Sequence, residues 1–323
     1  MTVRSRTATG VALAIGASAL FSLNATVSKL VLQHGLTSVQ LVSLRSAGAA
    51  VLLMGWTALT RPAALKVGRR ELAFLLVYGV LGIAMVQWLY FVAISRMPVG
   101  VALLLEYTAP LMVALWVRFV QGEPVRSRVW GALGLCLAGL ALVARVWHGL
   151  TLDGLGVLAG LGAAAALATY YLMGEQGLGQ RDPVSLMAWI FTFSAVLWGV
   201  VTPWWRFPFG ALSGRVHLSH GGLGWLTLPV WVLAAFVVLL GTVTAFGLVL
   251  LAVGRLGPAR VGILGMLEPV GSGLVAWWVL GETLLPVQLL GAAVVLGGIA
   301  LAETARRRAP EQPAVPLPEG VAP

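Results

Sequence analysis

Charged residues are scarce in this sequence of 323 residues: Asp, Glu, Lys and Arg make up 10% of it, against about 25% in soluble proteins. Hydrophobic residues make up 59%, and the mean hydropathy is +0.94. A soluble fold of this length could not bury so much apolar surface, so it would have to expose Leu, Val and Ala to water. The composition therefore excludes a soluble domain and predicts a protein whose solvent is the lipid bilayer.

Residue types that carry most chemistry are also few. The single cysteine, Cys136, lies inside an apolar run, which excludes an intrachain disulfide and a thiolate metal site. The only aspartates, Asp153 and Asp182, fall at the edges of apolar runs, and the sequence has none of the usual zinc-protease, P-loop or dinucleotide motifs. We therefore expect no enzyme, no metal or other cofactor, and no nucleic-acid partner.

Apolar runs about 20 residues long, each long enough to cross a bilayer, recur along the chain between breaks of charge, Gly and Pro. They predict an all-α membrane protein with ten spans, at about 8–32, 38–59, 71–94, 98–120, 127–147, 154–174, 184–206, 223–250, 257–280 and 285–304. The basic and then Pro-rich stretch 306–323 is expected to be a disordered tail.

The distribution of Lys and Arg between loops predicts the orientation, because cytoplasmic loops carry the excess of these residues. With the N-terminus inside, the loops predicted to be outside hold only Arg96, Arg145, Arg206 and Arg215, and the other loop and tail cations fall inside. The net charge of +10 then reflects membrane orientation. We expect a multi-pass protein of the cell membrane with both termini in the cytoplasm.

The two halves of the chain resemble each other. Arg96, Pro110 and Glu123 recur 159 positions later as Arg255, Pro269 and Glu282. These matches are informative because Arg, Pro and Glu are rare in membrane spans. We expect one repeat over 1–150 and another over 151–305, each with five spans. An odd number of spans inverts the second repeat in the membrane, as in many secondary transporters. A duplication that only builds a stable scaffold is the alternative.

The stretch from Ala252 to Ala302, with Glu268-Pro269, Gly281-Glu282 and a Gly-rich final span, resembles the EamA family of the drug/metabolite transporter superfamily. The first half repeats the pattern more weakly, with Ala109 in place of the Glu of the Glu-Pro pair. The resemblance covers nearly the whole chain. It implies a transporter that exports amino acids or similar metabolites, with proton exchange as its coupling.

Five ionisable residues fall within the predicted spans or at their edges, where charge is costly and usually faces an interior cavity. They are Lys29, Arg45, Glu106, Arg260 and Glu268. At the 159-residue offset Glu106 corresponds to Gly265, about one helical turn before Glu268, so the two carboxyl groups are expected on similar faces of related spans. They are candidates for carrying protons. The alternative is that basic residues neutralise them in ion pairs.

Arg45 and Lys29 are candidates for binding a substrate carboxylate, although either could instead reach the membrane surface. Trp88, Tyr107 and Tyr170 are candidates for lining a substrate path. Pro110 and Pro269 interrupt long apolar runs at matching places, which predicts broken helices beside a binding site or simple packing kinks.

These observations predict a secondary transporter that moves small metabolites outward by alternating access, with protons as the coupling ion. A passive facilitator of the same solutes and, less favoured, a membrane-embedded enzyme remain the alternatives. Gly156 and Gly160 form a GxxxG pattern that permits close helix contact, either within the chain or in a homodimer.

Overall fold

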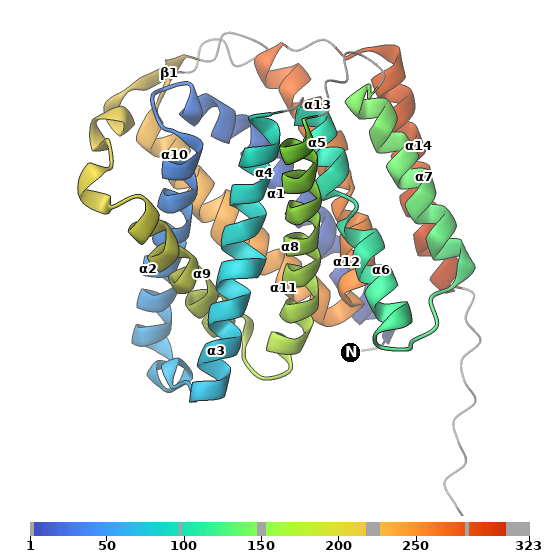
Figure 1. The fold of residues 1–323 in the computed structure, drawn as a ribbon, viewed down its shortest axis with the longest axis horizontal. Coiled ribbons are helices and arrows are strands. Elements are labelled where there is room, and N and C mark those ends of the chain that lie inside the picture. The colour runs from blue at the N-terminus through green and yellow to red at the C-terminus, as the bar shows by residue number, and fades with distance from the viewer. Residues whose placement is uncertain (1–2, 97–98, 147–152, 218–226, 282–283, 308–323) are drawn as a thin grey trace, which may run out of the picture.

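The structure is a computed structural model that describes residues 3–96, 99–146, 153–217, 227–281 and 284–307. Ten helical segments of these residues are long and apolar enough to cross a membrane, five in each half of the chain. They stand side by side as one bundle (Figure 1). The all-α fold with ten spans is therefore confirmed. The predicted tail lies outside the described residues apart from its first two, which continue the last helix.

The spans are made of fourteen α-helices, because four spans are interrupted. The first half comprises α1 (Val3–Leu32), α2 (Ser38–Thr60), α3 (Arg69–Val77) with α4 (Met85–Ile94), α5 (Val99–Glu106) with α6 (Ala109–Phe119), and α7 (Ser127–Ala144). The second half comprises α8 (Gly154–Leu178), α9 (Pro183–Val201), α10 (Val230–Val238) with α11 (Ala245–Leu256), α12 (Pro258–Gly265) with α13 (Leu267–Leu280), and α14 (Pro286–Arg307).

Two predicted spans need correction at their ends. The seventh helix stops at Val201, and short turns η3 (Trp204–Arg206) and η4 (Phe209–Ser213) follow it. A small antiparallel sheet of β1 (Arg215–His217) and β2 (Thr227–Pro229) comes next, so the eighth span starts at Val230. Pro203 cannot donate the backbone hydrogen bond that would continue a helix. The eighth span continues beyond the predicted end at 250 and stops at Leu256, where Gly257, with a φ of 78°, ends the helix.

The 159-residue repeat is visible in the irregularities of the helices. The third span contains a π-helical segment, η2 (Tyr78–Ala84), and the eighth contains another, η6 (Leu239–Thr244). Gly82 and Gly241, which are 159 positions apart, lie inside these segments. Gly122 and Gly281, also 159 apart, both adopt a positive φ, at 74° and 69°. Two halves with matching defects and five spans each are the inverted repeats predicted from sequence.

Small residues let α7 and α14 pack closely, and the two helices run together at one edge of the bundle (Figure 1). A Cβ atom added at Gly139 would lie 2.7 Å from the Val295 nitrogen, and one at Gly291 would lie 2.7 Å from the Gly139 oxygen. Cys136 faces Gly298 in the same contact. Gly160, of the GxxxG pattern, lies against Leu105 of α5, so this glycine serves packing within the chain.

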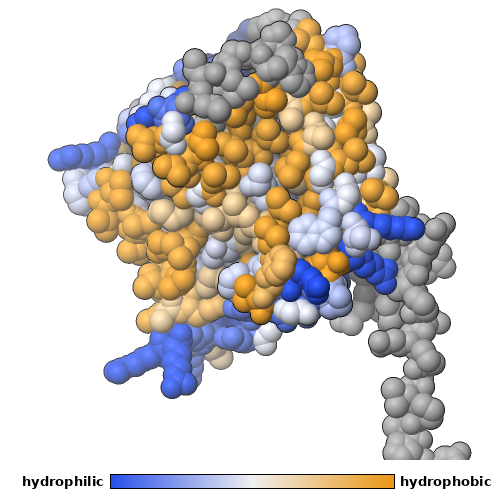
Figure 2. Space-filling model, turned by 45° about the vertical axis from the view of Figure 1, so that its right-hand side comes forward, coloured by the Kyte–Doolittle hydropathy of each residue, from blue (hydrophilic) through white to orange (hydrophobic). Residues whose placement is uncertain are grey.

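The outside of the bundle is apolar. Figure 2 shows hydrophobic side chains across most of the visible face, with hydrophilic ones gathered toward its lower end and margins. Large exposed residues such as Val51, Leu59, Val200 and Trp277 lie in the middle or at the ends of spans. This surface is suited to lipid, as the composition required.

Candidate functional site

A cavity of about 700 Å³ lies in the middle of the bundle, between the two halves. It extends along α1 from Ala14 to Leu32, the end of that helix farther from the N-terminus. The volume falls in the range typical of small-molecule sites. Both repeats contribute to its lining, through α1, α2, η2, α4, α5 and α7 of the first and α8, α11, α12, α13 and α14 of the second.

Two broken helices meet at the cavity. The fourth span breaks at Tyr107 and Thr108, between α5 and α6, and the ninth breaks at Met266, between α12 and α13. Tyr107 and Met266 are 159 positions apart, so the breaks are related by the repeat. Pro110 and Pro269 lie three residues beyond these two positions, and proline removes a helical hydrogen bond.

Serines of α1 bind backbone oxygens at the break in the ninth span. The Ser18 hydroxyl is shared between the Ala14 oxygen of its own helix at 3.1 Å and the Leu264 oxygen at 3.3 Å. The Ser22 hydroxyl is likewise shared between the Ser18 oxygen at 2.8 Å and the Glu268 oxygen at 3.1 Å. Leu264 lies in the last turn of α12, where carbonyl groups left by an interrupted helix need such partners in a membrane. The break is therefore a built feature of the fold, held by another helix.

The two carboxyl groups predicted as proton carriers line the same cavity. Tyr107 Oη donates a hydrogen bond to Glu268 Oε2 at 2.7 Å. Glu106 interacts electrostatically with Glu268. Among the described residues, its carboxyl group makes no hydrogen bond, and no ion pair within 4.0 Å. Glu268 thus has a fixed donor, and Glu106 has none among the described residues.

Arg45 lines the cavity from α2 and is anchored to the π-helical segment η6. Its Nε donates to Thr242 Oγ1 at 2.9 Å, and its Nη2 donates to the Gly241 oxygen at 3.3 Å. Arg45 is 8% exposed, so it does not reach the membrane surface. It interacts electrostatically with Glu268 without forming an ion pair among the described contacts. Lys29 also lines the cavity.

Three side chains place unpaired hydrogen-bonding atoms beside the cavity. Asn24 Oδ1, Ser28 Oγ and Gln87 Oε1 are buried and have no partner within the part of the chain that the structure describes. Buried polar atoms are nearly always paired, so such atoms need a ligand or water. Asn24 and Ser28 were not predicted from the sequence as binding groups. Their uncharged side chains give a much weaker signal in an apolar span than a carboxylate does.

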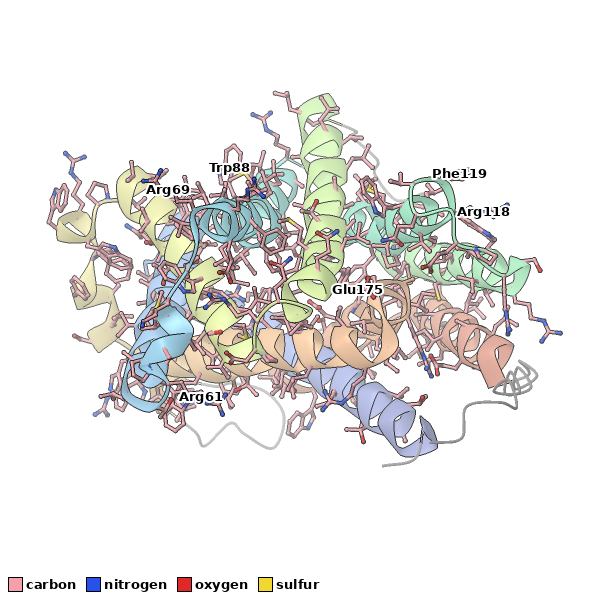
Figure 3. All side chains as sticks on the ribbon, turned by 90° about the horizontal axis from the view of Figure 1, so that it is seen from below. Arg61, Arg69, Trp88, Arg118, Phe119 and Glu175 are labelled. Atoms are coloured by element: carbon pink, nitrogen blue, oxygen red, sulfur yellow. The ribbon has the colours of Figure 1, made fainter. Side chains whose placement is uncertain are left out.

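The other predicted site residues are divided. Tyr170 lines the cavity, but its hydroxyl donates to the Phe246 oxygen at 3.1 Å, so it holds α8 to α11. Pro110 packs on Gly262, where it brings α6 close to α12. Trp88 is 41% exposed and lies at the outer edge of the bundle, away from the cavity (Figure 3). Trp88 is therefore not among the residues that line this cavity.

Arg260 does not neutralise the cavity carboxyl groups. It forms an ion pair with Glu303 of α14, to which both Nε and Nη2 donate. The charge on Arg260 is thus compensated near the start of the ninth span and the end of the tenth.

Interactions of Arg181 join two loops at the end of the bundle that carries the N-terminus. Its Nε donates to Glu71 Oε1 at 2.7 Å, and its Nη atoms donate to the oxygens of Ala64 and Lys66. Asp182 lies 3.9 Å from the Arg61 guanidinium. The labelled Arg61 and Arg69 mark this end in Figure 3. We call Arg181, Glu71 and the 64–66 oxygens the Arg181 cluster.

The chain was compared with known proteins. The sequence profile described as the EamA-like transporter family matches residues 8–145 and again 154–304. The threonine/homoserine exporter RhtA of Escherichia coli K12 is 32% identical over 239 residues, which cover 73% of this chain and 72% of RhtA. An uncharacterized transporter of Archaeoglobus fulgidus is 30% identical and covers 69% of this chain and 75% of its own. One solved crystal structure superposes with a TM-score of 0.76 at 18% identity, over 93% of this chain and 98% of that one.

Inverted repeats, paired broken helices and a cavity lined by both halves are features of a membrane transporter. The double profile match covers most of the chain, and it agrees with the curated relatives. The chain belongs to the EamA-like transporter family, and it is a multi-pass membrane transporter.

Proposed function

We propose that this protein exports small polar metabolites, amino acids such as threonine among them, from the cytoplasm by alternating access in exchange for protons. The observation that carries the proposal is the pairing of two carboxyl groups, Glu106 and Glu268, in one cavity between inverted repeats. The name of the relative RhtA supports the substrate class and the outward direction. The distribution of Lys and Arg between the loops supports a cytoplasmic location for both termini.

Two buried carboxyl groups suit proton coupling for an electrostatic reason. An isolated carboxylate is strongly disfavoured away from water, so each group favours binding a proton when the cavity closes around it. When the cavity opens to a compartment of higher pH, the proton can leave. In this conformation Glu268 accepts a hydrogen bond from the Tyr107 hydroxyl, whereas Glu106 has no such donor among the described residues.

The test is solute flux in proteoliposomes. Purified protein is reconstituted around a mixed pool of amino acids and related metabolites, and efflux is followed with and without an imposed pH gradient. Faster efflux of one solute under an inward proton gradient, abolished by a protonophore, is the expected result. Efflux that ignores the gradient would identify a passive facilitator instead, and no efflux of any solute would reject the substrate class.

A further inference from the structure

The cavity has a separation of hydrogen-bonding character along its lining. On the side of α4 and α5 it presents acceptors, namely the unpaired Gln87 Oε1 and the Glu106 carboxyl group. On the side of η6 it presents the guanidinium of Arg45. Glu268 interacts electrostatically with both Arg45 and Glu106, so it relates the two sides to each other.

The Arg45 side is fixed in place by the irregular helix. Two guanidinium nitrogens bind Thr242 and Gly241, and no contact of the third, Nη1, with a described residue takes up its hydrogens. Asn24 lies against the same Gly241, since a Cβ atom there would clash with the Asn24 side-chain oxygen. An anchored guanidinium is suited to a carboxylate, which would accept hydrogen bonds from it and from Nδ2 of Asn24, whose Oδ1 lies against Gly241.

The Gln87 side is suited to a cation that donates hydrogen bonds. Gln87 is 6% exposed, and its Nε2 is already committed to the Ile83 oxygen at 3.3 Å. This bond leaves the acceptor Oε1 of Gln87 as the free atom. Together with a carboxylate, such an acceptor binds an ammonium group, which has three donors and no acceptor. Burial makes an unmet acceptor costly, so discrimination against a ligand without donors is expected to be strong.

We infer that the cavity binds a zwitterionic α-amino acid with its ammonium group at Gln87 and Glu106 and its carboxylate at Arg45 and Asn24. This inference rests on the proposed function for its substrate class and adds which residues recognise which end. The two ends are recognised by different spans of the first repeat, and Arg45 is itself held by Thr242 and Gly241 of the second repeat. The bound carboxylate is therefore linked to the second repeat through Arg45, near the interface where a transporter site is expected.

Equilibrium binding tests this assignment without requiring transport. The probes are L-threonine, 1-aminopropan-2-ol, which lacks its carboxylate, and 2,3-dihydroxybutanoate, which lacks its ammonium group. Displacement of radiolabelled L-threonine from the purified full-length protein in nanodiscs gives each affinity. We expect both analogues to bind the wild type about 10- to 100-fold more weakly than threonine, the loss typical of one charged hydrogen-bonded group.

Two variants then assign the ends. Gln87→Leu should weaken threonine and the amino alcohol about tenfold or more while leaving the dihydroxy acid unchanged. Arg45→Gln should weaken threonine and the dihydroxy acid and leave the amino alcohol unchanged. Trp88→Phe, adjacent to Gln87 but outside the cavity, is the matched control and should change nothing.

Several outcomes overturn the inference. These are equal affinity of the wild type for all three probes, no binding of any probe, or a Gln87→Leu protein that keeps threonine affinity. The comparison of the three probes uses only the wild type, so the inference can be rejected even if the Arg45→Gln protein does not fold. Gradient-driven efflux of a different solute without threonine binding would support the proposed function and reject the inference. Threonine binding with the expected pattern but without gradient-driven efflux would support the inference and reject the proposed function.

Discussion

The Tyr107 hydroxyl donates a hydrogen bond to Glu268 at 2.7 Å, across the junction of the two inverted repeats. Tyr107 lies at the break of the fourth span, and Glu268 lies two residues past the break of the ninth. One contact thus joins the two interrupted helices and holds a carboxyl group inside the cavity. A change of conformation that separates the halves must alter this contact.

Removal of the Tyr107 hydroxyl is predicted to impair transport through Glu268. Tyr107→Phe should slow gradient-driven efflux about 10- to 150-fold, since a hydrogen bond to a charged group contributes roughly 1.5–3 kcal/mol and about 1.4 kcal/mol is a factor of ten. Glu268→Gln with Tyr107→Phe should be no slower than Glu268→Gln alone, because residues in one network are not additive. Initial rates for the four proteins in the same liposome preparation measure this. Additive losses would show that Tyr107 acts independently of Glu268.

The Arg181 cluster is predicted to keep the N-terminal end of the bundle closed. Arg181→Gln removes donors to Glu71 and to the oxygens of Ala64 and Lys66, so that end should open more often. The probe is Ala14→Cys in a Cys136→Ser background, because Ala14 is the cavity residue of α1 nearest to the N-terminal end. With Arg181→Gln added, this cysteine should react about 5- to 10-fold faster with a water-soluble thiol reagent applied from that end.

Arg255→Gln is the matched control for the Arg181 variant. Arg255 lies near the same end, but its Nη1 donates to the Leu251 oxygen of its own helix. Loss of that contact removes no link to another element, so the labelling rate should stay at the background value. Equal labelling of the Arg181→Gln and Arg255→Gln proteins would show that the Arg181 cluster does not hold the end closed.

A larger residue at the close contact between α7 and α14 is predicted to lower the stability of the fold. A methyl group added by Gly139→Ala would meet the backbone of Val295 and Gly291 at 2.7–2.8 Å, and backbone atoms cannot move aside cheaply. Overpacking of this kind costs about 1–3 kcal/mol. Gly134→Ala, on the same helix with nothing within 4 Å of the added carbon, is the control.

Thermal unfolding in one detergent compares these two glycine variants. The Gly139→Ala protein should unfold several degrees below the wild type, while the Gly134→Ala protein should match or slightly exceed it because alanine favours helix. A Gly139→Ala protein as stable as the wild type would show that α7 and α14 are packed less tightly than the structure indicates.

Asp182, at the start of α9 and outside the spans, is predicted to make stability depend on pH. Partial burial acts to raise the pKa of Asp182, but hydrogen bonds from the Ser185 hydroxyl and the Ser185 and Val184 amides, with the Arg61 guanidinium nearby, outweigh it. The net pKa lies below the ordinary value of 3.8.

A lowered pKa in the folded state means that the carboxylate of Asp182 stabilises the fold above its unfolded pKa of about 3.9. This stabilisation is lost as pH falls through the folded value. The unfolding temperature of the wild type should exceed that of Asp182→Asn at pH 7, and the difference should shrink at pH below about 4. A difference that is constant from pH 7 to pH 3 would exclude this role for the ionised group.

The number of spans could be predicted from the long apolar runs, and the duplication could be predicted because it shows in rare residues. Arg96 and Arg255, with Pro110 and Pro269, are hard to match by chance in an apolar chain. The same 159-residue offset also relates Gly82 to Gly241, which mark the two π-helical segments. Glycine is so frequent here, at 40 residues, that this pair carried no signal by itself.

The orientation of side chains within a span was harder to predict. Gln87 and Trp88 are adjacent, and consecutive residues point about 100° apart on a helix. Only one of them faces the cavity, and a uniformly apolar span shows no polar stripe from which to choose. The Arg260–Glu303 pair escaped prediction because it joins residues 43 positions apart on two different spans.

Proton-coupled export requires that protons move with the solute, and this movement can be measured in liposomes that contain a pH-sensitive dye. Addition of a transported amino acid to liposomes that contain the wild type should change the internal pH. At least one of the variants Glu106→Gln and Glu268→Gln should abolish that change. Glu175→Gln, at a residue outside the cavity lining, should preserve it. Solute flux with no pH change in the wild type, or a pH change that survives in both Gln variants, would contradict the assignment of these carboxyl groups as proton carriers.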